Sequence, residues 1–343
     1  MLSPGSGIAI NFVAILAIFG QAPGGNMTIK VAIIGLGIMG RRMLEHMCLH
    51  SDFEPKYLWD PDSNACDLAL NLNPQAHIMD KPNDAIHAAD LVYLACPPVV
   101  RKAYALEAVR SRKALFLEKP FGVDVDDSVD LVSQLESYAV PTAVNFSQAT
   151  GIALTELLEA KDRGEMGAIL GVDMIVTYPS WPRQWQKEAD WLRFRAEGGM
   201  TREVISHFLF FSERVLGPLT VVSANTTYPK DPKLCETEVL ARLESKDGCP
   251  VNILASVGGV QPDRQEFTIK GSLKSRRISE FYKDAESDGG EFLMLRDEPA
   301  DPRAVSLKGQ LDDLSLNCKG LPNRLATIQE ALRVQRLVER ILQ

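Results

Sequence analysis

The sequence predicts an α/β protein in which a doubly wound parallel sheet is followed by a second α/β region with an open sheet. From Thr28, short unbroken apolar runs alternate with helical stretches, the pattern of a parallel sheet covered on both faces. A glycine-rich loop joins the first apolar run to the first helical stretch. Beyond about Phe146, the strand-like stretches alternate apolar and polar residues, as in a sheet with one polar face.

Composition limits the class of protein. The 343 residues suffice for two domains, and 45% hydrophobic with 24% charged residues is typical of a globular chain. A net charge of −8 argues against a general nucleic-acid surface. The six cysteines are scattered and show no metal-ligand spacing. We therefore expect a cytoplasmic protein with reduced thiols, no metal site and no nucleic-acid partner.

The first 26 residues are expected to be an extension outside the fold. They contain an apolar run, residues 7–20, which is too short for a confident membrane span of about 20 residues. No positive charge precedes Lys30, so a secretory signal is not indicated either. Because Met27 directly precedes the first strand, a start site placed too early is a further interpretation. We expect no stable membrane association.

Residues 27–146 are expected to form a dinucleotide-binding domain. Its strands are predicted at residues 28–35, 55–60, 91–96, 114–119 and 141–146. Its helices are predicted at residues 39–50, at 99–112 and around Leu131, Leu135 and Tyr138.

The glycine loop indicates the cofactor. Gly35, Gly37 and Gly40 have G-x-G-x-x-G spacing between a strand and a helix, where backbone N–H groups can face a pyrophosphate. Asp60 ends the second strand, where a carboxylate accepts hydrogen bonds from ribose hydroxyls and repels a 2′-phosphate. The expected cofactor is NAD, with NADP disfavoured. The predicted contacts here are Gly35, Leu36, Gly37, Ile38, Met39, Gly40 and Asp60.

Residues 147–343 are expected to form a second domain. A helix is predicted at 153–167, with strands at 171–178, 220–228, 238–245 and 251–257. The chain closes on an amphipathic helix, residues 322–342, whose apolar stripe is Leu325, Ile328, Leu332, Val338 and Ile341.

Lys119 is the first catalytic candidate. The stretch "ALFLEKPFG" is a buried strand that ends in Glu118, Lys119 and a proline, and a buried strand has no structural need for these charges at its exit. The carboxyl end of such a strand lies at the crevice where ligands bind. A surface-turn lysine is the structural alternative. At the ends of these strands, Cys96, Pro97, Glu118, Lys119 and Asn145 are expected to contact the cofactor.

The second candidate is a pair on the helix between the Gly198–Gly199 and Gly217–Pro218 boundaries. Glu203 and His207 are four residues apart and share a face of this helix. An imidazole is matched to proton transfer near neutral pH, and Glu203 could orient it. A first-turn carboxylate that favours the helix dipole, and a core histidine, are the alternative interpretations.

A tryptophan- and arginine-rich segment, residues 178–195, precedes this helix. Trp181, Trp185 and Arg195 are predicted to form a substrate-binding wall, since aromatic faces and guanidiniums suit a polyol or an acid. The alternative is a loop whose tryptophans pack against the sheet.

These motifs together resemble the Gfo/Idh/MocA family of oxidoreductases. The resemblance begins near Ile29 and rests on the glycine loop, "LACPP", "EKPFG", "VNFSQ", "RGEMGAI" and "EGGMTREVISHF". It implies an N-terminal Rossmann domain and a C-terminal α/β domain with an open, mostly antiparallel mixed sheet, through which dimers or tetramers form.

The resemblance also implies residue roles. The family's lysine falls on Lys119 and points at the nicotinamide and the substrate hydroxyl, and its D-x-x-x-H motif falls on Glu203 and His207. Glutamate replaces the family's aspartate, and Phe210 replaces a frequent carboxylate. Both departures bear on the substrate.

The predicted function is NAD(P)-dependent transfer of hydride between nicotinamide and a secondary hydroxyl or ketone of a sugar, cyclitol or similar small polar substrate. One alternative is a non-catalytic dinucleotide-binding sensor. Another is a reductase of imines or double bonds, a reaction that does not need the Glu203–His207 pair for alcohol oxidation. The expected partners are a small-molecule substrate and further copies of the chain.

Overall fold

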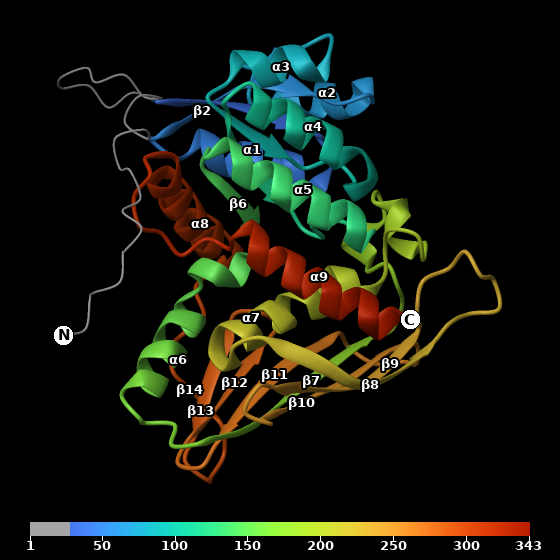
Figure 1. Cartoon of the computed structure of the whole chain (residues 1–343), viewed down its shortest axis with the longest axis vertical. Coiled ribbons are helices and arrows are strands. Elements are labelled where there is room, and N and C mark those ends of the chain that lie inside the picture. Colours follow the sequence, from blue (N-terminus) through green and yellow to red (C-terminus); the bar gives the residue numbers. More distant parts are fainter. Residues whose placement is uncertain (1–27) are drawn as a thin grey trace, which may run out of the picture.

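A computed structural model describes residues 28–343, so the predicted extension at residues 1–26 lies outside the described part of the chain. Figure 1 shows two layered halves, each built on its own sheet, with one long helix running between them. The upper half contains the first strands of the chain, and the lower half contains the larger sheet.

The upper sheet has six parallel strands in the order β3-β2-β1-β4-β5-β6. They are β1 (Ile29–Ile34), β2 (Phe53–Trp59), β3 (His77–Ile78), β4 (Leu91–Leu94), β5 (Ala114–Glu118) and β6 (Thr142–Asn145). The connecting helices are α1 (Ile38–Cys48), α2 (Ser63–Leu72), α3 (Pro82–Ala88), α4 (Pro98–Arg110) and α5 (Val125–Tyr138). Every residue of β4 and β5 is buried, because helices cover both faces.

The doubly wound arrangement follows from the strand order. Residues of α1 and α2 pack against one face of the sheet, and residues of α3, α4 and α5 pack against the other. The order reverses between β1 and β4, so their carboxyl ends open a crevice at this point of the sheet. The predicted N-terminal Rossmann fold is confirmed.

The lower sheet has eight strands in the order β14-β13-β12-β11-β7-β10-β9-β8. Its neighbours are antiparallel except for the parallel pair β7 and β10, which confirms the mixed, mostly antiparallel sheet. The strands are β7 (Ile169–Tyr178), β8 (Leu219–Thr227), β9 (Glu238–Ser245), β10 (Pro250–Val257), β11 (Arg264–Gly271), β12 (Ser275–Ser279), β13 (Lys283–Ser287) and β14 (Leu293–Met294). Helices α6 (Ile152–Asp162) and α7 (Ser206–Leu216) contribute buried residues to the core beside it.

The closing helix α9 (Ile328–Leu342) lies between the two halves in Figure 1. All five residues of its predicted stripe are buried. The predicted start at residue 322 was too early, because Thr327 forms a capping box with Glu330 and begins the helix there.

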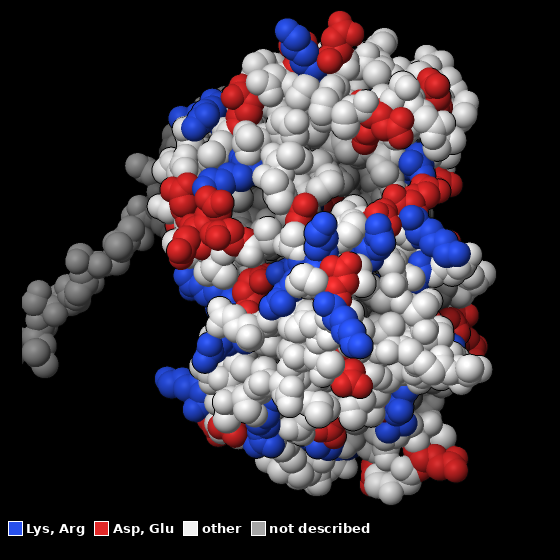
Figure 2. Space-filling model, turned by 90° about the vertical axis from the view of Figure 1, so that its right-hand side faces the viewer, with Lys and Arg blue, Asp and Glu red and all other residues white. Residues whose placement is uncertain are grey.

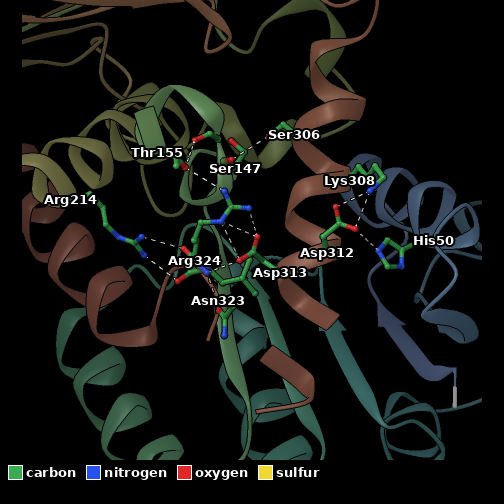
Figure 3. Close-up of polar contacts among 12 residues, drawn as sticks. His50, Ser147, Thr155, Arg214, Ser306, Lys308, Asp312, Asp313, Asn323 and Arg324 are labelled. Carbon is green, nitrogen blue, oxygen red and sulfur yellow. Dashed lines mark hydrogen bonds and ion pairs between the residues drawn. The ribbon is translucent and has the colours of Figure 1, made fainter. Parts of the chain in front are cut away.

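The structure contains a helix that the sequence analysis did not predict. Helix α8 (Pro302–Cys318) packs Leu307, Leu311 and Leu314 into the same core as α1 and β1. Figure 3 shows its polar contacts, including Asp313 with Arg324 and Asp312 with His50. Part of the chain beyond residue 146 therefore belongs to the core of the upper half. The proposed domain division near residue 146 stays a prediction.

Two further features concern the whole described chain. No helix within residues 28–343 combines the length and apolar character that a membrane crossing requires. The six cysteines are free thiols, and burial raises the pKa of Cys235 and of Cys318 to about 12. These two side chains are therefore neutral near pH 7.

Candidate active site

The glycine loop lies between β1 and α1 and needs its glycines for different reasons. Gly35 has φ +99°, and a Cβ there would lie 2.6 Å from the backbone nitrogen of Cys96. A Cβ on Gly40 would lie 1.9 Å from the Gly35 carbonyl oxygen, so only glycine allows this close approach. A Cβ on Gly37 would meet nothing within 4 Å, which leaves open space at the start of α1. The loop therefore has room for a pyrophosphate against its backbone.

Asp60 follows β2 and turns its carboxylate toward this loop. Its Oδ2 accepts a hydrogen bond of 2.6 Å from the Leu36 backbone N–H, and its Oδ1 accepts one of 2.9 Å from Asp62. No lysine or arginine occurs between Asp60 and Leu72, the end of α2. This edge of the crevice is therefore acidic.

The ends of β4, β5 and β6 form the floor of the crevice. Arg101 binds three carbonyl oxygens in it, those of Cys96, Glu118 and Pro120, with the first contact at 2.6 Å. The Glu118 carboxylate accepts hydrogen bonds from Tyr93 and, at 2.5 Å, from Asn145. Burial raises the pKa of Glu118. Glu118 and Asn145 thus bind each other across the ends of β5 and β6.

Lys119 continues from β5 into the crevice through a cis bond to Pro120. Its ammonium group forms an ion pair with the Glu203 carboxylate and donates a hydrogen bond of 3.0 Å to the Glu203 carbonyl oxygen. The two side chains are 9% and 17% exposed, so the pair is largely shielded from water. The structure therefore joins the predicted lysine of the first half to the predicted carboxylate of the second.

His207 also lines the crevice, but its surroundings differ from the prediction. The Glu203 carboxylate contacts Lys119 and, at 3.1 Å, the Gln186 amide, and not the imidazole. Edge-on contacts with Phe146 and Phe281 enclose the His207 ring, and among residues 28–343 its Nδ1 has no hydrogen-bond partner. The predicted orientation of His207 by Glu203 is thus not what the structure shows, because Lys119 lies closer to that carboxylate.

The electrostatic environment keeps His207 neutral. Burial lowers its pKa well below the usual range, and the positive charges of Lys119 and Arg183 lower it further. A neutral imidazole next to an ammonium group can accept a proton but does not supply one near pH 7.

A buried carboxylate that sequence reasoning missed positions this helix. Gly199 has φ +104°, and a Cβ there would collide with the Glu236 carboxylate. Glu236 accepts a hydrogen bond of 2.7 Å from the Thr201 backbone N–H, where a π-helical turn, Thr201–Ile205, leads into α7. The carboxylate thus caps the helix that presents Glu203 and His207. Its position, more than 30 residues away in sequence, gave no local signal.

A single cleft of about 930 Å³ connects these parts. It extends from Asp60 and the glycine loop to Lys119, Glu203 and His207. Figure 2 shows that one face of the molecule is hollowed between its two halves, with acidic and basic side chains gathered across this region. Of the predicted cofactor contacts, Leu36 and Gly40 are buried and do not line the cleft, whereas the others do.

The predicted substrate wall is only partly present. Trp185 lines the cleft, but Trp181 packs on Tyr178 and donates a 2.9 Å hydrogen bond to the Leu192 carbonyl. Arg195 stacks over Tyr228 at a second, smaller pocket of about 390 Å³. Neither of these two side chains lines the cleft, so their contact with a substrate stays a prediction. Arg183 and Trp191 of the same tryptophan- and arginine-rich segment also line the cleft. Lining residues that were not predicted include Arg42, Gln186 and Arg303.

The fold and the cleft define a dinucleotide-binding protein of the oxidoreductase class. Residues 29–146 match an oxidoreductase family with an NAD-binding Rossmann fold, and residues 154–276 match the C-terminal domain of the same family. The chain belongs to the Gfo/Idh/MocA family.

Curated relatives are distant. The chain is 24% identical to the inositol 2-dehydrogenase of Rhodococcus erythropolis over 223 residues, 62% of this chain and 63% of the relative. It is 25% identical to the 2,7-anhydro-N-acetylneuraminate hydratase of Escherichia coli over 114 residues, 33% of this chain and 30% of the relative. The matches thus span less than two thirds of either relative.

A solved structure shows the same fold. The myo-inositol 2-dehydrogenase of Lactobacillus plantarum superposes with a TM-score of 0.76 at 16% identity, and the match covers 92% of this chain and 96% of that one. At this identity the likeness concerns the fold.

Proposed function

We propose that the protein transfers hydride between a nicotinamide cofactor and a secondary hydroxyl or ketone of a small polar substrate such as a sugar or cyclitol. The observation that supports this most directly is the position of Lys119. It lies at the carboxyl end of β5, in the same cleft as the glycine loop, and contacts Glu203 of the second half. A cofactor that extends along the cleft from Asp60 would reach this group.

Each group in the cleft has a separate role in this proposed reaction. The loop around Gly37 binds the pyrophosphate through backbone N–H groups, and the bound nicotinamide supplies the hydride acceptor or donor. Glu203 holds the ammonium group of Lys119, which donates a hydrogen bond to the substrate oxygen and stabilises negative charge on it. Neutral His207 accepts the hydroxyl proton during oxidation, and the protonated imidazole returns that proton to the substrate oxygen in the opposite direction.

We further propose that NAD is preferred over NADP. The Asp60 carboxylate and the absence of a basic side chain between Asp60 and Leu72 support this choice. A 2′-phosphate would be placed against a carboxylate with no cation from α2 to compensate it.

A second function, dinucleotide sensing without catalysis, is favoured by one observation. Glu203 binds Lys119 and leaves His207 without the carboxylate partner that the family motif suggests. An imine or double-bond reductase is compatible with the same geometry, because it does not need the dyad.

The experiment is a panel of polyols, sugar acids, ketones and imines offered to the protein with NAD, NADH or NADPH, and followed by the absorbance of reduced nicotinamide. We expect at least one hydroxyl or ketone compound to turn over, and we expect the Lys119→Met variant to lose that activity. Tight cofactor binding without turnover of any compound would favour the sensor, and turnover of imines alone would favour the third function.

We also propose that the chain forms homo-oligomers, dimers or tetramers, through the open face of the lower sheet. Leu240 and Leu254 are directly opposite each other on β9 and β10, and they are 57% and 47% exposed. Apolar residues paired on an open sheet face suit a self-complementary contact. Light scattering should report more than one copy, and Leu240→Arg with Leu254→Arg should give monomers; a monomeric unmodified protein would contradict this.

A further inference from the structure

Three arginines converge on one tryptophan inside the cleft. The guanidinium carbons of Arg183, Arg303 and Arg42 lie 4.8, 5.3 and 5.5 Å from the centroid of the Trp185 ring. They come from three segments: the loop after β7, the first turn of α8 and the first helix α1. Trp185 is itself 42% exposed, so its ring and these cations face the same solvent-accessible space.

These cations have no carboxylate partner within residues 28–343. The Arg42 side chain hydrogen-bonds only the Met39 sulfur, and the Arg183 side chain only the Gln186 amide oxygen at 2.9 Å. No ion pair of Arg303 is formed in this part of the chain. Burial, together with the charge of Arg303, lowers the pKa of Arg42. Three neighbouring like charges are thus held together without compensation, which costs free energy unless an anion joins them.

The acidic side chains that line the cleft cannot supply that anion, because each is already engaged. The engaged groups are Glu188 with Arg41, Glu203 with Lys119, Glu280 with Lys283, Glu118 with Tyr93 and Asn145, and Asp60 and Asp62 with backbone N–H groups.

The cluster lies toward the reacting end of the cleft. Arg183 donates to Gln186, and Gln186 donates at 3.1 Å to the Glu203 carboxylate that holds Lys119. The charge of Arg183 also reaches His207, where it helps to lower the pKa. The opposite end of the cleft, at Asp60, is acidic. The position therefore favours a group of the substrate over the adenosine half of a cofactor.

We propose that Arg42, Arg183 and Arg303 bind an anionic group of the substrate, a carboxylate or a phosphate ester, and that Trp185 packs against the adjoining ring. Guanidinium groups bind both kinds of oxyanion through paired N–H donors, and an indole face suits a sugar ring. The substrate class is then a hydroxylated acid or a sugar phosphate rather than a neutral cyclitol. This inference rests on the proposed function, whose substrate it narrows.

The test measures binding, not turnover, with two matched pairs of probes on the NAD-saturated protein. Calorimetry compares glucuronate with glucuronamide, and glucose 6-phosphate with glucose. We expect the anionic member of at least one pair to bind about tenfold or more tightly, and the difference to shrink as salt is added. The pair with the larger difference identifies the anion as carboxylate or phosphate.

Variants assign the effect to the cluster. Arg183→Gln and Arg303→Gln should each remove most of the anion preference while NAD affinity stays within about twofold. Arg193→Gln is the matched control, because Arg193 lies in the same segment but pairs with Asp190 and does not line the cleft. Equal binding of both members of each pair would overturn the proposal. A parallel loss of NAD affinity in the cluster variants would also overturn it, since the arginines would then serve the cofactor.

The outcomes separate this proposal from the proposed function. Anion preference without turnover of any panel compound would refute the reaction but leave the anion site intact. Turnover of neutral polyols without an anion preference would refute the anion site and leave the reaction intact.

Discussion

The two ends of the cleft are built in different ways. At the cofactor end, the determining residues lie within one β-strand, loop and helix, from Gly35 to Gly40, with Asp60 at the end of the next strand. At the reacting end, Lys119 meets Glu203 across 84 positions of sequence, and Glu236 positions the helix from a further segment. Local constraints fix the first end, and tertiary packing fixes the second.

This difference shows which features of a site can be predicted from local sequence. A glycine loop is constrained by backbone sterics, so its spacing carries the geometry with it. The partner of a charged side chain is decided by which opposite charge the fold brings nearest. The i, i+4 relation of Glu203 and His207 correctly indicated a shared face, but it did not indicate that Lys119 would bind the carboxylate.

The largest effect on NAD affinity is expected at Gly40, at the cofactor end of the cleft. In Gly40→Ala, the added Cβ must displace the Gly35 carbonyl, which would otherwise lie 1.9 Å away. Distortion of this kind costs roughly 1–3 kcal/mol, so NAD affinity should fall about ten- to hundredfold. Gly290→Ala is the control, because a Cβ there meets nothing within 4 Å. Unchanged NAD affinity of Gly40→Ala would show that the loop is not the phosphate site.

A smaller effect is expected at Asp60. Asp60→Ala removes both the ribose acceptor and the 2.6 Å contact with the Leu36 N–H, so NAD should bind about tenfold more weakly. Asp60→Asn removes the charge but keeps an oxygen that can accept the hydrogen bond from the loop. This variant should mainly reduce the difference in affinity between NAD and NADP. Fluorescence titration with each cofactor measures the two affinities. An unmodified protein that binds NADP as tightly as NAD would contradict the assignment.

The smallest expected effect is on the pH dependence of stability, and it comes from His207 at the reacting end of the cleft. The pKa of His207 is lowered in the folded protein. Just below pH 6.5, the ordinary histidine pKa, this imidazole therefore binds a proton in the unfolded chain but not in the folded protein. The free energy of unfolding should therefore fall as pH drops through this window, by at most about 1.4 kcal/mol per pH unit. Urea unfolding of His207→Asn should therefore show a flatter dependence of stability on pH between about pH 7.5 and 5.5, roughly one pH unit on either side of the ordinary histidine pKa. The exposed His77→Asn serves as control, and an identical profile for both variants would refute the shift.

The sequence indicated most of the strands of the Rossmann half, because β4 and β5 are unbroken apolar runs, but it did not indicate helices α2 and α3. Helix α8 was missed although Leu307, Leu311, Leu314 and Cys318 recur at helical spacing. Its place beside α1 could not have been predicted, since nothing local specifies which sheet it covers. The arginine cluster could not be predicted for the same reason. Arg42 and Arg303 are far apart in sequence, and only the fold places both beside Trp185.

The central claim is that Lys119 and His207 act on one proton at the reacting end, while cofactor affinity is set at the other. Turnover and NAD affinity of Lys119→Met, His207→Ala and the double variant test it most directly, with Lys102→Met, on the surface-exposed ion pair with Asp127, as control. We expect each single variant to lose roughly 10²–10⁴-fold in turnover with NAD affinity nearly unchanged. The double variant should be far less impaired than the product of the two losses, because the groups share a step. Ordinary turnover of Lys119→Met would contradict the account.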